Sequence, residues 1–203
     1  MKPLLPLLCL SALWLLGACA AVPGQQQVAA APFGAMDAAG ADGVAGEKYS
    51  ADGVIGFQGF GPAPFGAGEE DVRMAWGRDM GDSTPDEPGG CHYLLPHPRQ
   101  AAGEDRIGFM IHGGRFVRID VAAADIPAPG GGRTGQSAER IGVLYGDAVQ
   151  QLPHKYTPGA AYLRIPDPAG SRAVLVFETG SDGDVERWRI GLEPEVDWVE
   201  RCG

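Results

Sequence analysis

Positive charge is scarce in this chain. Sixteen Lys and Arg residues stand against 26 Asp and Glu residues, so the formal net charge is −10 at pH 7 and the isoelectric point is about 4.7. Contacts to phosphate groups need clustered Lys and Arg side chains. We therefore expect no nucleic-acid partner and no electrostatic attraction to an anionic lipid surface.

Recognisable catalytic motifs are also missing. The sequence has no G-x-S-x-G, H-E-x-x-H, Walker-type G-K-[ST] or C-x-x-C pattern. No Asp or Glu stands at metal-ligand spacing beside His92 and His97. His154 follows the second expected helix, where it either packs a turn or acts as a functional loop residue. We expect no catalytic residue, no metal site and no cofactor.

A long hydrophobic run is absent too. The apolar stretch Leu4–Leu16 is too short to span a bilayer comfortably, and no stop-transfer pattern follows it. Together with the positive charge of Lys2 and the small residues Gly17 and Ala18, it has the layout of a secretory signal peptide. We therefore expect residues 1–18 to be an export signal.

The run Leu16-Gly17-Ala18-Cys19 resembles a bacterial lipobox. The resemblance implies cleavage before Cys19, diacylglycerol on its sulfur and an acyl chain such as palmitate on its new amino group, which together anchor the chain stably. Ala20 rather than Asp follows the cysteine, and in enteric lipoproteins this implies sorting to the outer membrane, facing the periplasm. The alternative is an ordinary signal peptide that contains a cysteine.

Four cysteines are present, and two remain for the folded part. Cys9 leaves with the signal and Cys19 takes the lipid. Cys91 and Cys202 form one even pair in an oxidising compartment, so we predict a disulfide between them. It would close a loop of roughly 110 residues, worth about 4 to 5 kcal/mol in the chain-entropy model. The alternative is a pair of buried free thiols.

Residues 19–52 read as the lipidated cysteine followed by a tether. This stretch is rich in Ala, Gly and Gln and has few aromatic residues, so it cannot bury enough apolar surface to offset the entropy of ordering. The folded part is expected from residue 53 onward, as a first helix and strand module over residues 53–123 and a second over residues 124–203.

An internal duplication supports this division. Superposing Trp76-Gly77 on Tyr145-Gly146 gives an offset of 145 − 76 = 69 residues. The same offset places Gly66 on Gly135, Glu70 on Glu139, Val72 on Ile141, and Tyr93-Leu94 on Tyr162-Leu163. Matches that continue through a helix, a glycine and the following strand indicate two related halves.

Each half predicts a short helix that ends at glycine, followed by antiparallel strands. Acidic residues suit the first helical turn, and apolar residues then recur at helical spacing. The apolar run 56–66 is expected to pack on the sheet. The expected strands are 91–95, 107–111 and 115–121 in the first half, and 161–165, 173–179, 185–192 and 196–202 in the second.

This pattern resembles the small outer-membrane assembly lipoproteins of the BamE/SmpA type, and two copies in tandem resemble the β-lactamase inhibitor protein. The residues that carry the resemblance are Gly66, Glu70, Val72, Gly77, Gly135, Glu139, Ile141 and Gly146. It implies an α+β fold that recognises another protein, with helices on one sheet face and the other face open. It transfers no functional residue.

Strand alternation predicts which side chains occupy the open face. If the apolar sets face the helices, the opposite face presents Phe116, Arg118, Tyr162, Arg164, Arg187 and Arg189. Arginine and aromatic residues are frequent in interface hot spots, so we predict a protein-binding face there. The alternative is a solvated face whose arginines pair with Asp120, Glu195 and Asp197. Trp188 and Trp198 are expected in the core.

The sequence thus predicts an outer-membrane lipoprotein that faces the periplasm and binds another envelope protein as a scaffold, assembly factor or inhibitor, without enzymatic activity. Two alternatives stay open. One is a cell-wall carbohydrate-binding lipoprotein that uses Tyr162 and His154, and the other is a hydrolase with an unrecognised site.

Overall fold

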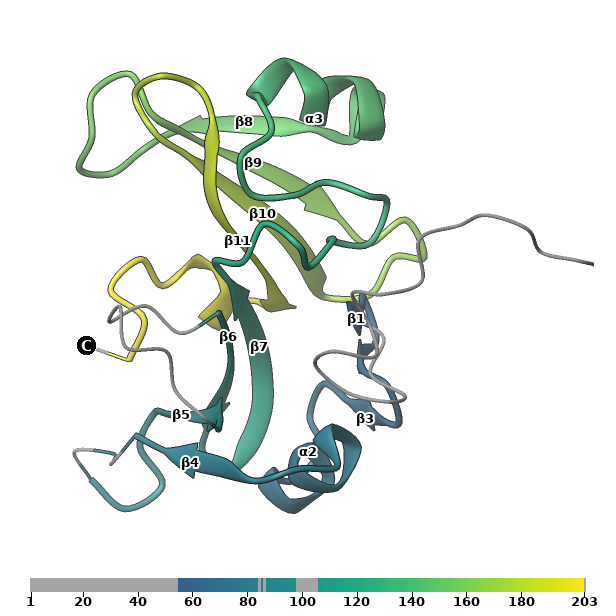
Figure 1. Ribbon diagram of the computed structural model, residues 1–203, viewed down its shortest axis with the longest axis vertical. Helices are drawn as coiled ribbons and strands as arrows, with labels where there is room; N and C mark the ends of the chain where they lie inside the picture. The colour runs from purple at the N-terminus through teal and green to yellow at the C-terminus, as the bar shows by residue number, and fades with distance from the viewer. Residues whose placement is uncertain (1–54, 84, 86, 98–105, 203) are drawn as a thin grey trace, which may run out of the picture. The chain divides into compact units, whose positions relative to one another are not determined.

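The computed structural model describes residues 55–83, 85, 87–97 and 106–202. The expected signal peptide, the lipidated Cys19 and the tether lie outside these residues. The described part is α+β, as expected, with two short α-helices and a large antiparallel sheet (Figure 1). Within it, no helix has both the length and the apolar character needed to cross a membrane.

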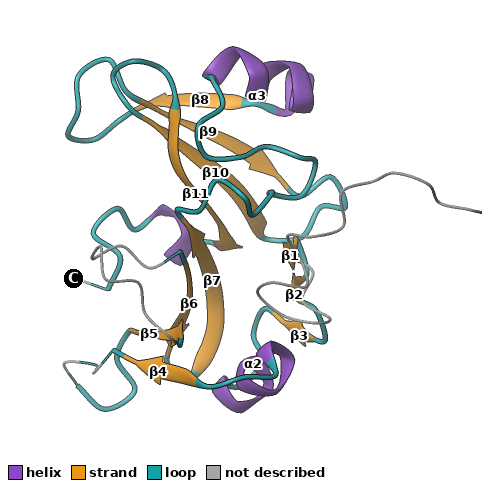
Figure 2. Ribbon diagram, in the orientation of Figure 1, coloured by secondary structure: helices purple, strands orange, loops and turns teal. Residues whose placement is uncertain are grey.

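Eight antiparallel strands form the main sheet (Figure 2). In spatial order they are β4 (Met80–Asp82), β5 (His92–Pro96), β6 (Ile107–His112), β7 (Arg115–Val121), β11 (Val185–Leu192), β10 (Ala173–Thr179), β9 (Ala161–Pro166) and β8 (Gln150–Pro153). The strands β4 to β7 follow the first helix along the chain, and β8 to β11 follow the second. The sheet therefore joins two meanders through the central pair β7 and β11.

A small three-stranded sheet precedes the first helix, and two 3-10 turns complete the elements. The small sheet comprises β1 (Ile55–Gly56), β2 (Gly59–Phe60) and β3 (Ala63–Pro64), and the turns are η1 (Gly146–Ala148) and η2 (Glu195–Asp197). Phe60 and Ala63 are buried in the main core, so the run 56–66 packs as expected. The short strands β4 and β8 were not predicted from the sequence.

The helices α2 (Glu69–Trp76) and α3 (Ala138–Tyr145) each end directly before a glycine, as predicted. The Gly68 N–H donates to Asp71 Oδ2 at 3.0 Å, which satisfies one free amide at the start of α2. Gly77 then takes the left-handed conformation that ends the helix. Gly146 has positive φ but not the left-handed helical ψ, and the chain continues there as η1.

Ser137 caps α3 by accepting the Arg140 N–H at 3.3 Å. Loss of this side-chain acceptor leaves a helix-end amide without its partner. We expect Ser137→Ala to lower the free energy of unfolding by about 1 kcal/mol, measured by urea unfolding. Ser137→Asp, which keeps a capping oxygen, should stay within about 0.5 kcal/mol of the parent chain. Equal losses in both variants would contradict the capping role.

The main core lies between one sheet face and the two helices. Val72, Trp76 and Ile141 from the helices meet buried side chains of the central strands. Phe60 and Phe109 make an edge contact with ring centroids 5.0 Å apart. Other fully buried members of this face are Phe116, Phe177, Ile119, Leu175 and Trp188. Trp188 is thus a core residue, as expected.

A β-bulge in each central hairpin changes the faces predicted by simple alternation. The register of β6 and β7 shifts between Met110 and Ile111, so Phe116 and Ile119 reach the same helix-side core while Val117 belongs to the opposite face. The register of β10 and β11 shifts between Glu178 and Thr179. It brings Val185 into the helix-side core with Trp188 and Ile190, whereas simple alternation would place Val185 with Arg187 on the opposite face.

Candidate functional site

The last described residues of the chain lie against the sheet face opposite the helices. The prediction of a strand over residues 196–202 is wrong, because this stretch forms the turn η2 and further turns. Val196 is fully buried and packs with Tyr162, Val174 and Val176. Trp198 packs against a second apolar cluster on the same face. We call Glu193–Cys202 the C-terminal segment and the surface beneath it the covered face.

Arg118 holds the C-terminal segment by its backbone. Only 1% of this residue is exposed. Its Nη1 donates to the carbonyl oxygens of Glu195 at 2.9 Å and Trp198 at 2.7 Å. Its Nε donates to Asp120 Oδ2 at 2.9 Å, and the Tyr93 hydroxyl donates to the same oxygen at 2.8 Å. The guanidinium therefore links the sheet, a buried carboxylate and two segment carbonyls.

Arg189 of β11 and Arg164 of β9 also contact the segment. Arg189 is also buried; its Nε donates to the Val196 carbonyl at 2.7 Å and its Nη1 to Glu178 Oε2 at 2.8 Å. Arg164 Nη2 donates to Glu193 Oε1 at 2.8 Å and Asp197 Oδ2 at 3.0 Å. These arginines thus bind both the backbone and the carboxylates of the segment.

Burial and pairing have opposite effects on this ionic group. Burial disfavours the carboxylate of Asp120, yet the adjacent Arg118 guanidinium holds the pKa of Asp120 below its usual value. Burial and the Asp120 charge raise the pKa of Tyr93, so its hydroxyl remains a donor. Burial and the nearby Arg118 lower the pKa of Arg189 although Glu178 opposes this. Arginine nevertheless remains charged at neutral pH.

The structure brings five of the six residues predicted for a binding face onto one face of the sheet. Paired positions in the ladders place Arg118, Tyr162, Arg164, Arg187 and Arg189 together there. The bulge instead turns Phe116 into the helix-side core. Arg118, Tyr162 and Arg189 are buried under the C-terminal segment, whereas the Arg187 side chain remains 40% exposed. The expectation that this face is open is therefore corrected.

The disulfide predicted between Cys91 and Cys202 is present. The two Cα atoms lie 5.3 Å apart, and 111 residues separate the cysteines in sequence. Cys91 directly precedes β5, and Cys202 ends the C-terminal segment. The bond therefore fastens the far end of the segment to the first half of the sheet.

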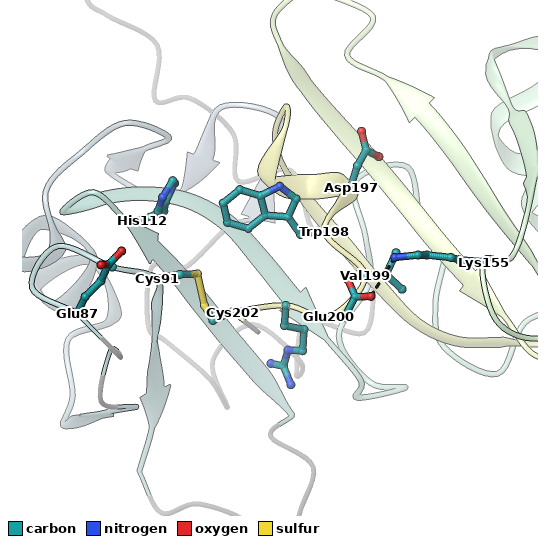
Figure 3. A pocket seen from close by; sticks show the side chains of 11 residues that line it. Glu87, Cys91, His112, Lys155, Asp197, Trp198, Val199, Glu200 and Cys202 are labelled. Atoms are coloured by element: carbon teal, nitrogen blue, oxygen red, sulfur yellow. Dashed lines mark hydrogen bonds and ion pairs between the residues drawn. A yellow bond between two sulfur atoms is a disulfide. The ribbon is translucent and has the colours of Figure 1, made fainter.

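A cleft of about 590 Å³ borders the C-terminal segment (Figure 3). Its charged and aromatic lining comprises Glu87, His112, Lys155, Asp197, Trp198, Glu200 and Arg201, and both disulfide cysteines also line it. His112 Nδ1 lies 2.9 Å from Glu195 Oε1, and the His112 ring meets Trp198 edge-on. The cleft therefore exposes the disulfide and one side of the segment.

Beside this cleft, the edge strand β8 and the loop after it carry exposed apolar side chains. Leu152 is 46% exposed and Tyr156 is 59% exposed. Lys155 lies over the Tyr156 ring at 4.8 Å and pairs with Glu200 at 2.9 Å, and the Tyr156 hydroxyl donates to the same carboxylate. We call Leu152, Lys155, Tyr156 and Glu200 the β8 margin.

His154 orders the loop of the β8 margin. Its Nδ1 accepts the N–H groups of Tyr156 at 3.1 Å and Thr157 at 3.0 Å, so this nitrogen is unprotonated. Its Nε2 points to Glu178 Oε1 at 3.4 Å, and its ring stacks on Tyr162 at 4.6 Å. His154 thus packs the turn, and it covers Tyr162, the residue considered for carbohydrate stacking.

The described residues contain no group of three or more His, Cys, Asp or Glu side chains arranged to hold a metal ion. His92 Nε2 lies 3.2 Å from Glu69 Oε2 at the first helix. His97 lies close to Gly81, where an added Cβ would come within 2.6 Å of its ring. These two histidines therefore contact different partners.

No protein-family model and no curated protein matches the chain. Among solved structures, the uncharacterized protein YfeY from Escherichia coli is 14% identical, with a TM-score of 0.42 over 67% of this chain and 97% of that one. An extracellular SCP-domain protein from Bacillus anthracis is 11% identical, with a TM-score of 0.42 over 64% of this chain. This chain spans only 44% of that protein.

A DUF4309 family protein, YjgB from Bacillus subtilis, is 18% identical, with a TM-score of 0.39 over 63% of this chain and 79% of that one. All three similarities thus have TM-scores below 0.5 and identities below 20%.

Proposed function

We propose that this chain binds another protein of the bacterial envelope through the β8 margin and that its role is non-enzymatic. The observation that carries the proposal is the exposure of Leu152 and Tyr156 next to a cleft. Large exposed apolar side chains beside paired charges are common at recognition surfaces. His154 already orders the loop, which lowers the entropy cost of binding.

The edge of the sheet offers a binding mode for such a partner. All four residues of β8 are exposed, and in the described part of the chain β8 pairs only with β9. An exposed edge strand can pair with an extended segment of another chain, which supplies main-chain hydrogen bonds. Leu152 and Tyr156 would then contact side chains of that segment.

The proposed location rests on the sequence. The lipobox resemblance at Cys19 would anchor the chain in the outer membrane with the folded part in the periplasm. The disulfide fits an oxidising compartment of this kind. The tether over residues 20–52 would let the β8 margin reach partners near the membrane.

We also propose that the folded part consists of two related modules of the BamE/SmpA type. The helices α2 and α3 start and end 69 residues apart, as do the isolated bridges Gly68–Arg115 and Ser137–Asp184. Two loop hydrogen bonds repeat with the same offset: Gly66 N–H donates to Phe116 O, and Gly135 N–H donates to Val185 O. Chance repetition would not extend to such non-local contacts.

The ladder between β7 and β11 supports the same relation. Arg189 pairs with Asp120, and 189 − 69 = 120, so this pair maps onto itself under the offset. The pair of Ile190 with Ile119 maps onto the pair of Trp188 with Val121. A pseudo-twofold axis relating the two modules would therefore pass close to the pair Asp120 and Arg189.

Site-specific photocrosslinking in intact cells tests the β8 margin. A photoreactive residue at position 156 of the anchored chain should capture one envelope protein. Leu152→Ser should reduce the yield of that adduct by about tenfold. The matched control is a photoreactive residue at Met74, which is 71% exposed on α2. Identical adducts from positions 156 and 74, or an unchanged yield in Leu152→Ser, would refute the proposal.

A further inference from the structure

We infer that the covered face is a binding site for an acidic peptide segment and that residues 193–201 occupy it as an intramolecular ligand, retained by the Cys91–Cys202 disulfide. This site adjoins the contact proposed at the β8 margin, because Glu200 of the segment pairs with Lys155 there. It explains why Arg118 and Arg189, which were predicted to face a partner, are buried: they face a peptide that belongs to the same chain.

The contacts have the character of peptide recognition. Three carbonyl oxygens of the segment, those of Glu195, Val196 and Trp198, accept hydrogen bonds from Arg118 and Arg189. The side chain of Val196 fills an apolar site between strands, as an anchor residue does in an interface. Because these contacts are made to backbone carbonyls and to one apolar side chain, a peptide from another chain could make them as well.

Charge is complementary between segment and face. Residues 193–201 carry four carboxylates and one guanidinium, so their net charge is −4 + 1 = −3. The face beneath carries Arg118, Arg164, Arg187 and Arg189 against Asp120 and Glu178, which gives 4 − 2 = +2. A cationic face on a chain of net charge −10 selects an acidic ligand.

The segment has no counterpart in the first module. Residues 69 positions earlier, 124–133, run along the helix side of the sheet, where Ile126 and Ala128 join the main core. The C-terminal segment instead lies on the opposite side with Val196 buried there. This step rests on the proposed relation between the modules. It makes the segment an addition to the repeated fold rather than a part of it.

The disulfide determines whether the C-terminal segment can dissociate from the covered face. Both sulfur-bearing residues line the cleft, so a small dithiol can reach them. Its thiolate attacks one sulfur to form a mixed disulfide, and its second thiol resolves this bond. Cys91 and Cys202 each gain a proton and one electron, and the dithiol is oxidised to a disulfide. The segment is then attached only through β11, and a separate acidic peptide can compete for the face.

The test uses the full chain and a labelled peptide with the sequence of residues 193–201, and fluorescence anisotropy measures binding. Chain reduced with dithiothreitol should bind the peptide at least about tenfold more tightly than oxidised chain, and added salt should weaken binding. A scrambled peptide of equal charge should bind more weakly. Arg164→Gln should cost about tenfold, whereas Arg140→Gln, an exposed residue of α3, should cost nothing.

A second variant covers the case in which reduction unfolds the chain, as circular dichroism would reveal. Val196→Ser with Asp197→Asn keeps the disulfide but weakens the internal ligand, and it should bind the peptide more tightly than the parent chain. If neither the reduced chain nor this variant gains affinity, the inference is wrong. Leu152→Ser should leave peptide binding unchanged. A negative result in the peptide-binding assay is therefore distinguishable from a negative result in photocrosslinking at the β8 margin.

Discussion

Replacing Arg118 with Met should lower the free energy of unfolding by about 3–5 kcal/mol, because a buried charge then loses its partner. Asp120 would keep the Tyr93 hydroxyl as a donor but lose the guanidinium, and the carbonyl of Trp198 would lose its Arg118 donor. The carbonyl of Glu195 would keep only the Trp198 N–H of the turn. Each unsatisfied buried acceptor adds its own desolvation cost. Urea unfolding followed by circular dichroism measures the difference.

Two further variants separate the charge from the packing. Arg118→Lys keeps the charge, but its three donors cannot replace the four hydrogen bonds of the guanidinium, so it should lose a smaller part of the stability. The double variant Arg118→Met with Asp120→Leu removes both charges and should recover at least about 1 kcal/mol relative to Arg118→Met. A loss below about 1 kcal/mol in Arg118→Met would show that this pair is not a structural link.

Local signals made both helices and most strands predictable. Acidic residues stand in the first turn of each helix, and Ser137 also caps the second helix, so these signals act within one turn. Long strands such as β7 and β10 have enough apolar and β-branched residues to be recognised. The edge strands β4 and β8 carry little of that signal, since β8 (Gln150–Pro153) has two glutamines, one leucine and a final proline.

The bulges could not be read from the sequence in the same way. Alternation assigns each side chain to a face by parity, and one extra residue reverses every assignment beyond it. Phe116 and Val185 are both on the far side of such a residue. The hint of the reversal in the sequence is that two apolar residues, Phe116 and Val185, stand close to glycine-containing turns.

The error over the C-terminal segment has a different cause. Val196 and Trp198 alternate with acidic residues, which is the pattern of a half-buried strand. The segment buries Val196 and partly buries Trp198, but it does so by lying on the sheet face. Periodicity reports which side chains are buried and not whether the backbone hydrogen bonds go to strands or to arginines. The buried arginines were predicted on the correct face of the sheet, but the segment that they contact belongs to the same chain.

Replacing both Cys91 and Cys202 with Ser should lower the free energy of unfolding by about 4 kcal/mol. The bond joins residues 111 apart, so its removal frees a long loop in the unfolded chain. Urea unfolding of the double variant and of reduced, alkylated parent chain should agree. A domain of this size commonly has about 5–15 kcal/mol of stability, so the variant should remain folded in buffer. A loss below about 1 kcal/mol would instead mean that the unfolded chain gains little freedom from the break.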